Sequence, residues 1–371
     1  MKILIGADIV PTKSNKEAFS SGNISAIIDE SLEKKLGEAD FRIFNLETPL
    51  ADKEAPIKKC GPNLLAPTSC INGIKKLGVD LFTLANNHIM DHGEEAFNTT
   101  LKTLSENEIA YTGAGANLFA AQKPYIINKE DKKIGVYACA EHEFTIAGEN
   151  VAGANPFDVL ESFDHIANLK DECDYVIVLY HGGKEYYRYP SPILQKVCRK
   201  MCDKGADLVI CQHSHCIGCR EEYKGSEIVY GQGNFIFVGT SNNEYWNNAL
   251  LIELKLEDEA SIEYIPLEKK NGIIGISEDD DILKKFNVRS KEIKKDGFVK
   301  AEYSKFAREM YDSYLSRIYG VSLLFRIVNK LCGHRLKHKK KISEERKLMV
   351  QNIIRCEAHR ELFLRGVEND N

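Results

Sequence analysis

The sequence has no long hydrophobic run, no internal repeat and no low-complexity segment. No stretch reaches the roughly eighteen consecutive apolar residues that a membrane-spanning helix needs. The first residues, MKILIGAD, contain an apolar run of only three residues (Ile3, Leu4 and Ile5), which is too short for the core of a signal peptide. Eleven cysteines without an export signal are typical of a reducing compartment. We therefore expect a cytoplasmic protein without a membrane-spanning helix.

A strong positive charge is missing as well. The 371 residues carry a formal net charge of −5, so no global field attracts nucleic acid, and no nucleic-acid partner is expected. The charge is unevenly spread, because residues 301–371 carry +6 and residues 1–300 carry −11. A partner with an anionic surface should therefore bind the C-terminal part of the chain.

Short apolar runs alternate with amphipathic segments, a pattern typical of βαβ units around a largely parallel sheet. The predicted strands are 2–7, 41–46, 80–85, 133–138, 174–180 and 207–211, and the predicted helices are 24–36, 69–77, 94–106, 156–169 and 192–204. From residue 216 to about 266, short alternating runs predict antiparallel strands. After residue 270 the chain becomes polar and helical. The pattern predicts an α/β domain over 1–270 and a basic, helical C-terminal extension over 271–371.

The segment 317–341 has eight basic residues and no acidic one, interleaved with large apolar side chains. An amphipathic helix of this composition would lie on an anionic membrane surface. The alternative is a helix that packs its apolar face on the body of the protein or on a second copy. The sequence leaves both open, together with the oligomeric state.

Polar side chains stand where the predicted strands end. These are Asp8, Glu47, Asn87, His88, His181, His213 and His215. In an open α/β sheet, the carboxyl ends of parallel strands form the crevice where ligands bind. Carboxylate, amide and imidazole groups without clustered thiolates suit manganese, iron or zinc. The pattern predicts a metal site at this edge, although helix capping would explain any one of these residues alone.

Seven segments carry a family resemblance. They are GAD (6–8), NLETPL (45–50), LANNHIMDHG (84–93), YTGAGAN (111–117), HGGKEYYRYP (181–190), QHSHCI (212–217) and IVYGQGNFIF (228–237). In order and spacing they resemble the CapA-type capsule proteins, which are linked to poly-γ-glutamate synthesis and belong to the calcineurin-like metallophosphoesterase superfamily. The resemblance covers about residues 1–266. It implies a metallophosphatase-like α/β sandwich of mixed sheets flanked by helices.

The resemblance also implies a site for two divalent metal ions. Asp8 and His215 would hold one metal, Asn87, His181 and His213 would hold the other, and Glu47 would bridge the pair. His88 would be the catalytic acid on the substrate side. Such a metal pair polarises the electrophile and activates water, and a positioned acid adds roughly 10²–10⁴-fold.

One ligand that is usual in the superfamily is absent. Most of its phosphoesterases have Asp-x-His in the first motif, but here Asp8 is followed by Ile9 and Val10. Metal binding at this position is then weak or completed by another group. Phosphatase activity therefore does not follow from the resemblance.

Several residues near these motifs have two interpretations. Asp91 would either act with a neighbouring histidine as a catalytic residue or cap the helix that begins near Glu94. Glu185 is predicted to contact substrate or metal, with a solvated loop carboxylate as the alternative. Asn234 is predicted to fix the loop beside the substrate, with a turn as the alternative. We expect an exposed loop at 141–143, with a metal or substrate contact as the alternative. We expect a solvated pair of lysines at 58–59, with contact to an anionic substrate as the alternative.

We expect a metal-dependent hydrolase tied by the resemblance to capsule or poly-γ-glutamate biosynthesis. Its substrate would be an ester or amide bond of an anionic polymer, a peptide or a phosphorylated metabolite. One alternative is an epimerase in which the metals stabilise an enolate while a base removes a proton next to a carbonyl. Another is a catalytically weak scaffold that docks onto a membrane or a polymer-synthase complex through 317–341.

Overall fold

The computed structural model describes residues 1–129, 131–237 and 244–319, and eight further residues between 328 and 354. The chain divides into two compact units, Met1–Lys300 and Ala301–Asn371. Within the described residues, every strand lies in the first unit. The predicted site residues belong to this unit too.

The first unit contains two mixed sheets. One has the order β16-β15-β14-β1-β2-β3-β4, with β13 paired to β1, and the other has the order β11-β12-β10-β9-β7-β6. The strands of the first sheet are β1 (Lys2–Val10), β2 (Phe41–Leu46), β3 (Leu81–Thr83), β4 (Ala110–Thr112), β13 (Ile236–Phe237), β14 (Asn248–Leu256), β15 (Ala260–Lys270) and β16 (Ile273–Ile276). Those of the second are β6 (Tyr125–Lys129), β7 (Lys132–Ala140), β9 (Tyr175–His181), β10 (Leu208–Gln212), β11 (Arg220–Tyr223) and β12 (Ser226–Tyr230). A short pair, β5 (Ala114–Gly115) and β8 (Gly153–Ala154), stands apart.

The first sheet has a parallel half and an antiparallel half, whereas the second has a parallel centre and antiparallel edges. In the first sheet β1, β2, β3 and β4 are parallel neighbours, and β14, β15 and β16 run antiparallel. In the second sheet β7, β9, β10 and β12 are parallel, and β6 and β11 are antiparallel edges. The sequence pattern indicated the parallel strands and the later antiparallel ones, but it did not divide them between two sheets.

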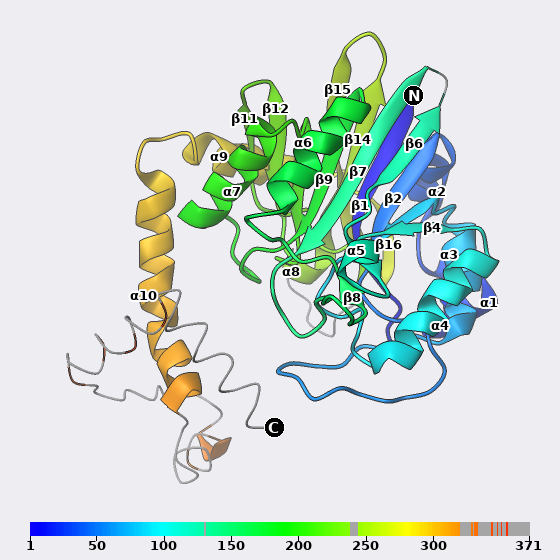
Figure 1. Ribbon diagram of the computed structural model, residues 1–371, viewed down its shortest axis with the longest axis horizontal. Helices are drawn as coiled ribbons and strands as arrows, with labels where there is room; N and C mark the ends of the chain where they lie inside the picture. The colour runs from blue at the N-terminus through cyan, green and yellow to red at the C-terminus, as the bar shows by residue number, and fades with distance from the viewer. Residues whose placement is uncertain are drawn as a thin grey trace. The chain divides into compact units, whose positions relative to one another are not determined.

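The two sheets pack face to face, with helices on the outside (Figure 1). Ile3 and Ile5 of β1 meet Ile177 of β9 in the core between the sheets. Leu4 points the other way and packs under the helices, because successive side chains of a strand face opposite sides. The helices are α1 (Lys16–Ser21), α2 (Glu30–Gly37), α3 (Ile71–Lys76) and α4 (Gly93–Glu106) over the first sheet, and α6 (Ser162–Glu172) and α7 (Pro192–Asp203) over the second. The predicted α/β sandwich of mixed sheets flanked by helices is confirmed.

The predicted helix over 24–36 is shorter in the structure. Ile24–Ala26 forms a single 3₁₀ turn, and α2 begins only at Glu30. Asp29 is the reason, because its side chain accepts a hydrogen bond of 2.9 Å from the amide of Leu32 and so caps the helix. The prediction missed this N-cap because the apolar spacing continues across it.

The first unit extends to Lys300, beyond the predicted domain limit at residue 270. Helix α9 (Asp280–Glu292) belongs to it, since Phe286 packs on Tyr264 with ring centroids 5.1 Å apart. Arg289 donates hydrogen bonds of 2.7 and 3.0 Å to the carbonyls of Gly218 and Ile217. Helix α9 therefore supports the loop that follows the predicted ligand His215.

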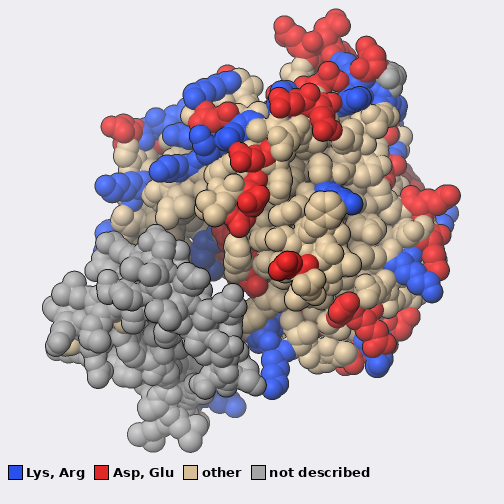
Figure 2. Space-filling view, viewed as in Figure 1, with Lys and Arg blue, Asp and Glu red and all other residues tan. Residues whose placement is uncertain are grey.

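Helix α10 (Phe298–Tyr319) runs into the second unit. Most of the basic segment 317–341 lies outside the described residues, so both interpretations of it stay predictions. No helix among the described residues is long and apolar enough to cross a membrane. On the face of the molecule in Figure 2, acidic and basic side chains are interspersed.

Gly6 and Gly37 offer a matched test of the packing beneath β1. A Cβ atom at Gly6 would lie 2.2 Å from the buried Phe44 ring, whereas a Cβ at Gly37, at the end of α2, meets nothing within 4 Å. We expect Gly6→Ala to lower the free energy of unfolding by about 1–3 kcal/mol through overpacking. Gly37→Ala should be neutral or stabilising by up to about 1 kcal/mol. Urea unfolding measures both, and equal stabilities would contradict the packing described here.

Candidate metal centre

A β-bulge in β1 places Asp8 at the site. Ile5 pairs with Ile43 of β2 but Asp8 pairs with Asn45, so β1 contains one extra residue between the two pairs. Bulges of this kind re-aim side chains next to functional sites. Asp8 is fully buried, and its Oδ1 accepts a hydrogen bond of 2.7 Å from Asn45 Nδ2. Its Oδ2 has no hydrogen-bond partner among the described residues.

Asn45 and Asn86 form a buried support beneath Asp8. Asn86 Nδ2 donates to the Leu46 carbonyl at 2.8 Å and to Asn45 Oδ1 at 3.0 Å. These bonds fix the Asn45 amide with its Nδ2 towards Asp8. Asn45 lies in the NLETPL motif, but its position in the sequence does not indicate this supporting role.

Glu47 follows β2 directly and is fully buried. Neither of its carboxylate oxygens has a hydrogen-bond partner among the described residues. Burial raises the pKa of Glu47, and the charge of Glu185 adds to the effect. A buried carboxyl group without partners is costly, so both oxygens are open to a cation.

The Nε2 atom of His181 lies close to one potential ligand atom from each of three other residues. It is 3.0 Å from Asn87 Oδ1, 3.2 Å from Glu47 Oε1 and 3.2 Å from His213 Nδ1. Burial lowers the pKa of His181 and of His213 well below the ordinary value, so both rings are neutral. A neutral ring nitrogen carries one proton or one lone pair and cannot satisfy three neighbours. A cation among these atoms would satisfy them all.

Asn87 presents its oxygen to this group because its nitrogen is held elsewhere. Asn87 Nδ2 donates a hydrogen bond of 3.1 Å to Glu143 Oε2. Glu143 lies on the predicted exposed loop and is exposed, but it orients a predicted ligand. Nothing in the residue pattern around Asn87 or Glu143 indicates this contact.

His213 and His215 both have positive φ, 74° and 51°. Such angles are uncommon for residues other than glycine, and strain of this kind clusters at functional sites. The turn brings both rings to the edge where Asp8 and Glu47 lie. His215 Nδ1 lies 2.8 Å from Asn234 Oδ1, so Asn234 fixes the ring next to the site.

The ligand atoms form two groups that share one residue. Glu47, His181 and His213 make one group, and Asp8, Glu47 and His215 make the other, with the atoms of each group within 4.8 Å of one another. The structure therefore brings together the predicted ligands and places Glu47 where a bridging carboxylate would lie. The oxygen and nitrogen donors fit manganese, iron or zinc. Val10, in the position of the usual histidine, is buried and pairs with Phe237 of β13, so it offers no ligand.

His88 and Asp91 form a buried pair beside these groups. His88 Nδ1 lies 2.5 Å from Asp91 Oδ2, and Asp91 is fully buried. Helix α4 has His92 at its N-cap position and no side-chain cap, so Asp91 is not the capping residue. Lys59 forms an ion pair with Asp91 and has a side chain only 2% exposed. The predicted solvated pair at 58–59 is wrong for Lys59, because a folded-back loop buries its ammonium group.

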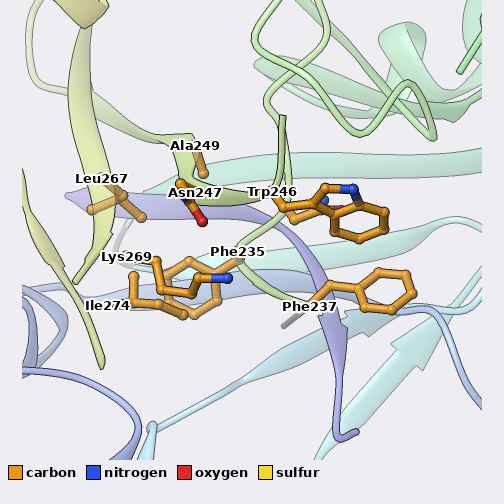
Figure 3. A pocket seen from close by; sticks show the side chains of 9 residues that line it. Phe235, Phe237, Trp246, Asn247, Ala249, Leu267, Lys269 and Ile274 are labelled. Atoms are coloured by element: carbon orange, nitrogen blue, oxygen red, sulfur yellow. The ribbon is translucent and has the colours of Figure 1, made fainter. Parts of the chain in front are cut away.

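An aromatic wall lies next to His215. The Trp246 ring stacks on His215 with centroids 5.5 Å apart and an interplanar angle of 21°, and Phe237 meets Trp246 edge-on at 5.1 Å. Figure 3 shows a small pocket that Trp246 and Phe237 help to line, together with Phe235 and Lys269. A reactant held beside His215 would therefore meet a flat apolar surface.

Metal binding should release protons near neutral pH. Burial, with a contribution from Glu47, raises the pKa of Asp8 from 3.8 to about 8, so at pH 7 this carboxyl is mostly protonated in the metal-free protein. A cation requires the carboxylate, so it displaces the proton, and affinity should rise with pH up to about 8. Calorimetry of Mn²⁺ binding in buffers of different ionisation enthalpy measures the protons released. We expect more release at pH 7 than at pH 9, and the same heat in every buffer at pH 7 would contradict this prediction.

Comparison with known proteins gives a family match. The model of the family described as "Bacterial capsule synthesis protein PGA_cap" matches residues 2–238. The "Capsule biosynthesis protein CapA" of Bacillus anthracis is 27% identical over 253 residues, which are 64% of this chain and 60% of the relative. The "PGA biosynthesis protein CapA" of Bacillus subtilis is 28% identical over 211 residues, 54% of this chain and 53% of the relative. The chain thus spans less than two thirds of the length of either relative.

Among solved structures, a phosphatase from Mycoplasma pneumoniae is similar with a TM-score of 0.45 and 15% identity. The alignment covers 76% of this chain and 96% of the phosphatase.

Proposed function

Because the chain belongs to the bacterial capsule synthesis protein family PGA_cap, we propose that it is a metal-dependent hydrolase of capsule or poly-γ-glutamate biosynthesis. The observation that carries the proposal is the pair of ligand groups that share the buried Glu47. Among the described residues, both oxygens of Glu47 and Oδ2 of Asp8 lack a hydrogen-bond partner. Such open carboxylate oxygens beside neutral histidines in one buried cluster are what a dinuclear metal site requires.

Each of the two groups of ligand residues would hold one metal ion, and Glu47 belongs to both. Asp8 and His215 would hold one divalent cation, His181 and His213, with the oxygen of Asn87, would hold the other, and Glu47 would bridge them. When bound, the metal pair would supply Lewis acidity and an activated water for attack on an ester or amide bond.

His88 would carry the proton chemistry. Its Nδ1 is engaged by Asp91 Oδ2 at 2.5 Å, which leaves Nε2 as the nitrogen that meets a reactant. From Nε2 the ring would donate a proton to the leaving atom. Asp91 would hold the ring in the orientation and tautomer that this step needs.

The names of the two Bacillus relatives, which refer to capsule and PGA biosynthesis, point to an anionic polymer or a γ-glutamyl peptide as the substrate. Trp246, stacked on His215, would line the path of such a chain.

A scaffold without turnover is the second candidate. Val10 favours it, because a buried valine stands where the superfamily usually has a metal ligand. Elemental analysis of the purified protein, with a screen for hydrolysis of bis-p-nitrophenyl phosphate and γ-glutamyl-p-nitroanilide, separates the two. The proposal expects bound manganese, iron or zinc and turnover of at least one probe. If the protein binds little metal, and if His213→Ala changes neither its metal content nor its function, the protein would be a scaffold.

A further inference from the structure

Lys59 is a buried cation in the loop that connects β2 to the 3₁₀ turn Thr68–Cys70. Its side chain is 2% exposed, whereas its neighbour Lys58 is exposed. A lysine of this loop would ordinarily keep its ammonium group in water, since charged groups are almost never fully buried unless they are paired. The burial therefore calls for a specific partner.

The partners of Lys59 all lie on the segment that carries His88. The ammonium group pairs with Asp91 Oδ1 and donates a hydrogen bond of 3.2 Å to the carbonyl of Asn87. It also lies 3.2 Å from His88 Nδ1. One side chain thus touches a predicted metal ligand's backbone, the predicted acid and the residue that holds the acid.

Asp91 uses each of its oxygens for a different task. Oδ1 faces Lys59, while Oδ2 accepts from the amide of Leu64 at 2.6 Å and lies 2.5 Å from His88 Nδ1. His88 Nδ1 must carry a proton to donate to Asp91, so it cannot also accept a hydrogen bond from Lys59. The ammonium group therefore lies 3.2 Å from this nitrogen without a hydrogen bond between them. The arrangement fixes the ring with Nε2 unengaged by this cluster.

The loop that carries Lys59 is itself held against the same segment. Asn63 Nδ2 donates to the Asp91 carbonyl at 2.7 Å, and the Ile57 amide donates to it at 3.0 Å. The Ala55 amide donates to His92 Nδ1 at 2.8 Å. The ammonium group therefore sits at a fixed place before any ligand arrives, as positioning of a catalytic group requires.

We propose that Lys59 is a positioning residue, whose ammonium group balances the charge of Asp91 and so holds His88 with Nδ1 on Asp91 and Nε2 towards the reactants. The proposal rests on the hydrolase function proposed above. It adds a residue to that site which acts through Asp91 and does not itself touch the substrate.

The test compares Lys59→Met with Lys58→Met, which removes the same charge one residue away at an exposed position. The first measurement needs no metal and no substrate: the Nδ1–H signal of His88 in protein labelled with ¹⁵N-histidine, treated with chelator and assigned by its loss in His88→Asn. The second is hydrolysis of bis-p-nitrophenyl phosphate with Mn²⁺, resolved into kcat and KM.

We expect Lys59→Met to shift or broaden the His88 Nδ1–H signal and to lower kcat by about 10- to 100-fold, with KM changed less than about twofold. Lys59→Arg, which keeps the charge, should partly restore both the His88 Nδ1–H signal and kcat. Lys58→Met should match the wild type in both measurements. If Lys59→Met does not fold, Lys59→Gln, which keeps an N–H donor without the charge, should show the same signal change.

A His88 signal in Lys59→Met or Lys59→Gln identical to that of the wild type would overturn the role of Lys59. A wild type that hydrolyses no probe would remove the hydrolase function, yet the metal-free signal would still test whether Lys59 positions His88. A lower kcat in Lys58→Met equal to that in Lys59→Met would also overturn the proposal, because the effect would then be one of surface charge.

Discussion

Replacing Glu47 with glutamine should remove bound metal from both positions at once. Glutamine keeps the volume of the side chain but loses the charge and one ligand oxygen, and Glu47 belongs to both ligand groups. Since loss of a residue that only supports a metal ligand costs about 10–100-fold in affinity or activity, loss of a bridging ligand should cost more than about 100-fold in each. Elemental analysis and Mn²⁺ titration measure the effect.

The same substitution should have the opposite effect on the metal-free protein. Glu47 has two buried oxygens without partners among the described residues, and an amide is cheaper to bury than an unpaired carboxylate. In chelator, Glu47→Gln should therefore unfold at a higher temperature than the wild type. With Mn²⁺ the order should reverse, because metal stabilises only the protein that binds it.

Glu95→Gln is a control for the charge change. Its side chain is 73% exposed on α4, where it pairs with Lys53. This variant should keep full metal content. Two equivalents of metal bound to Glu47→Gln would show that Glu47 is not a bridge.

Replacing His88 with asparagine should leave the metal in place and abolish most of the turnover. His88 is in neither ligand group, so the Mn²⁺ affinity should change little. A general acid contributes roughly 10²–10⁴-fold, and kcat should fall within that range. Parallel measurement of metal content and of hydrolysis of the responsive probe separates this variant from Glu47→Gln.

His165→Asn is the matched control for this prediction. His165 lies on α6, where its Nδ1 is 3.2 Å from the Tyr137 hydroxyl. This variant should retain both metal and turnover. Loss of metal in His88→Asn would make His88 a ligand, and unchanged turnover would remove it from the mechanism.

Much of the fold could be predicted from the sequence, because strands buried on both faces are short apolar runs. β1, β9 and β10 all have that character and lie within a few residues of their predicted ends. The resemblance implied a sandwich of mixed sheets, but the apolar pattern did not assign each strand to its sheet. Strand pairing joins segments far apart in the chain, as where β1 pairs with β14, and an apolar run does not specify its neighbour.

The candidate site was also predicted only in part. Asp8, Glu47 and His181 are visible in the sequence because each is a polar residue at or near the end of an apolar strand: Asp8 two residues before the end of β1, Glu47 directly after β2 and His181 at the end of β9. Lys59 and Asn45 were missed because their roles exist only in tertiary contacts. A lysine in a polar loop is usually solvated, and only the pairing with Asp91 shows otherwise.

The proposed function depends on two metal ions, one on either side of Glu47, held by residues distant in the chain. Crystals grown with Mn²⁺ and measured at the manganese absorption edge test it most directly. We expect two anomalous peaks, one beside Asp8 and His215 and one beside His181 and His213, with Glu47 between them. No peak at this edge of the sheets, or a Glu47 carboxylate that contacts neither ion, would contradict it.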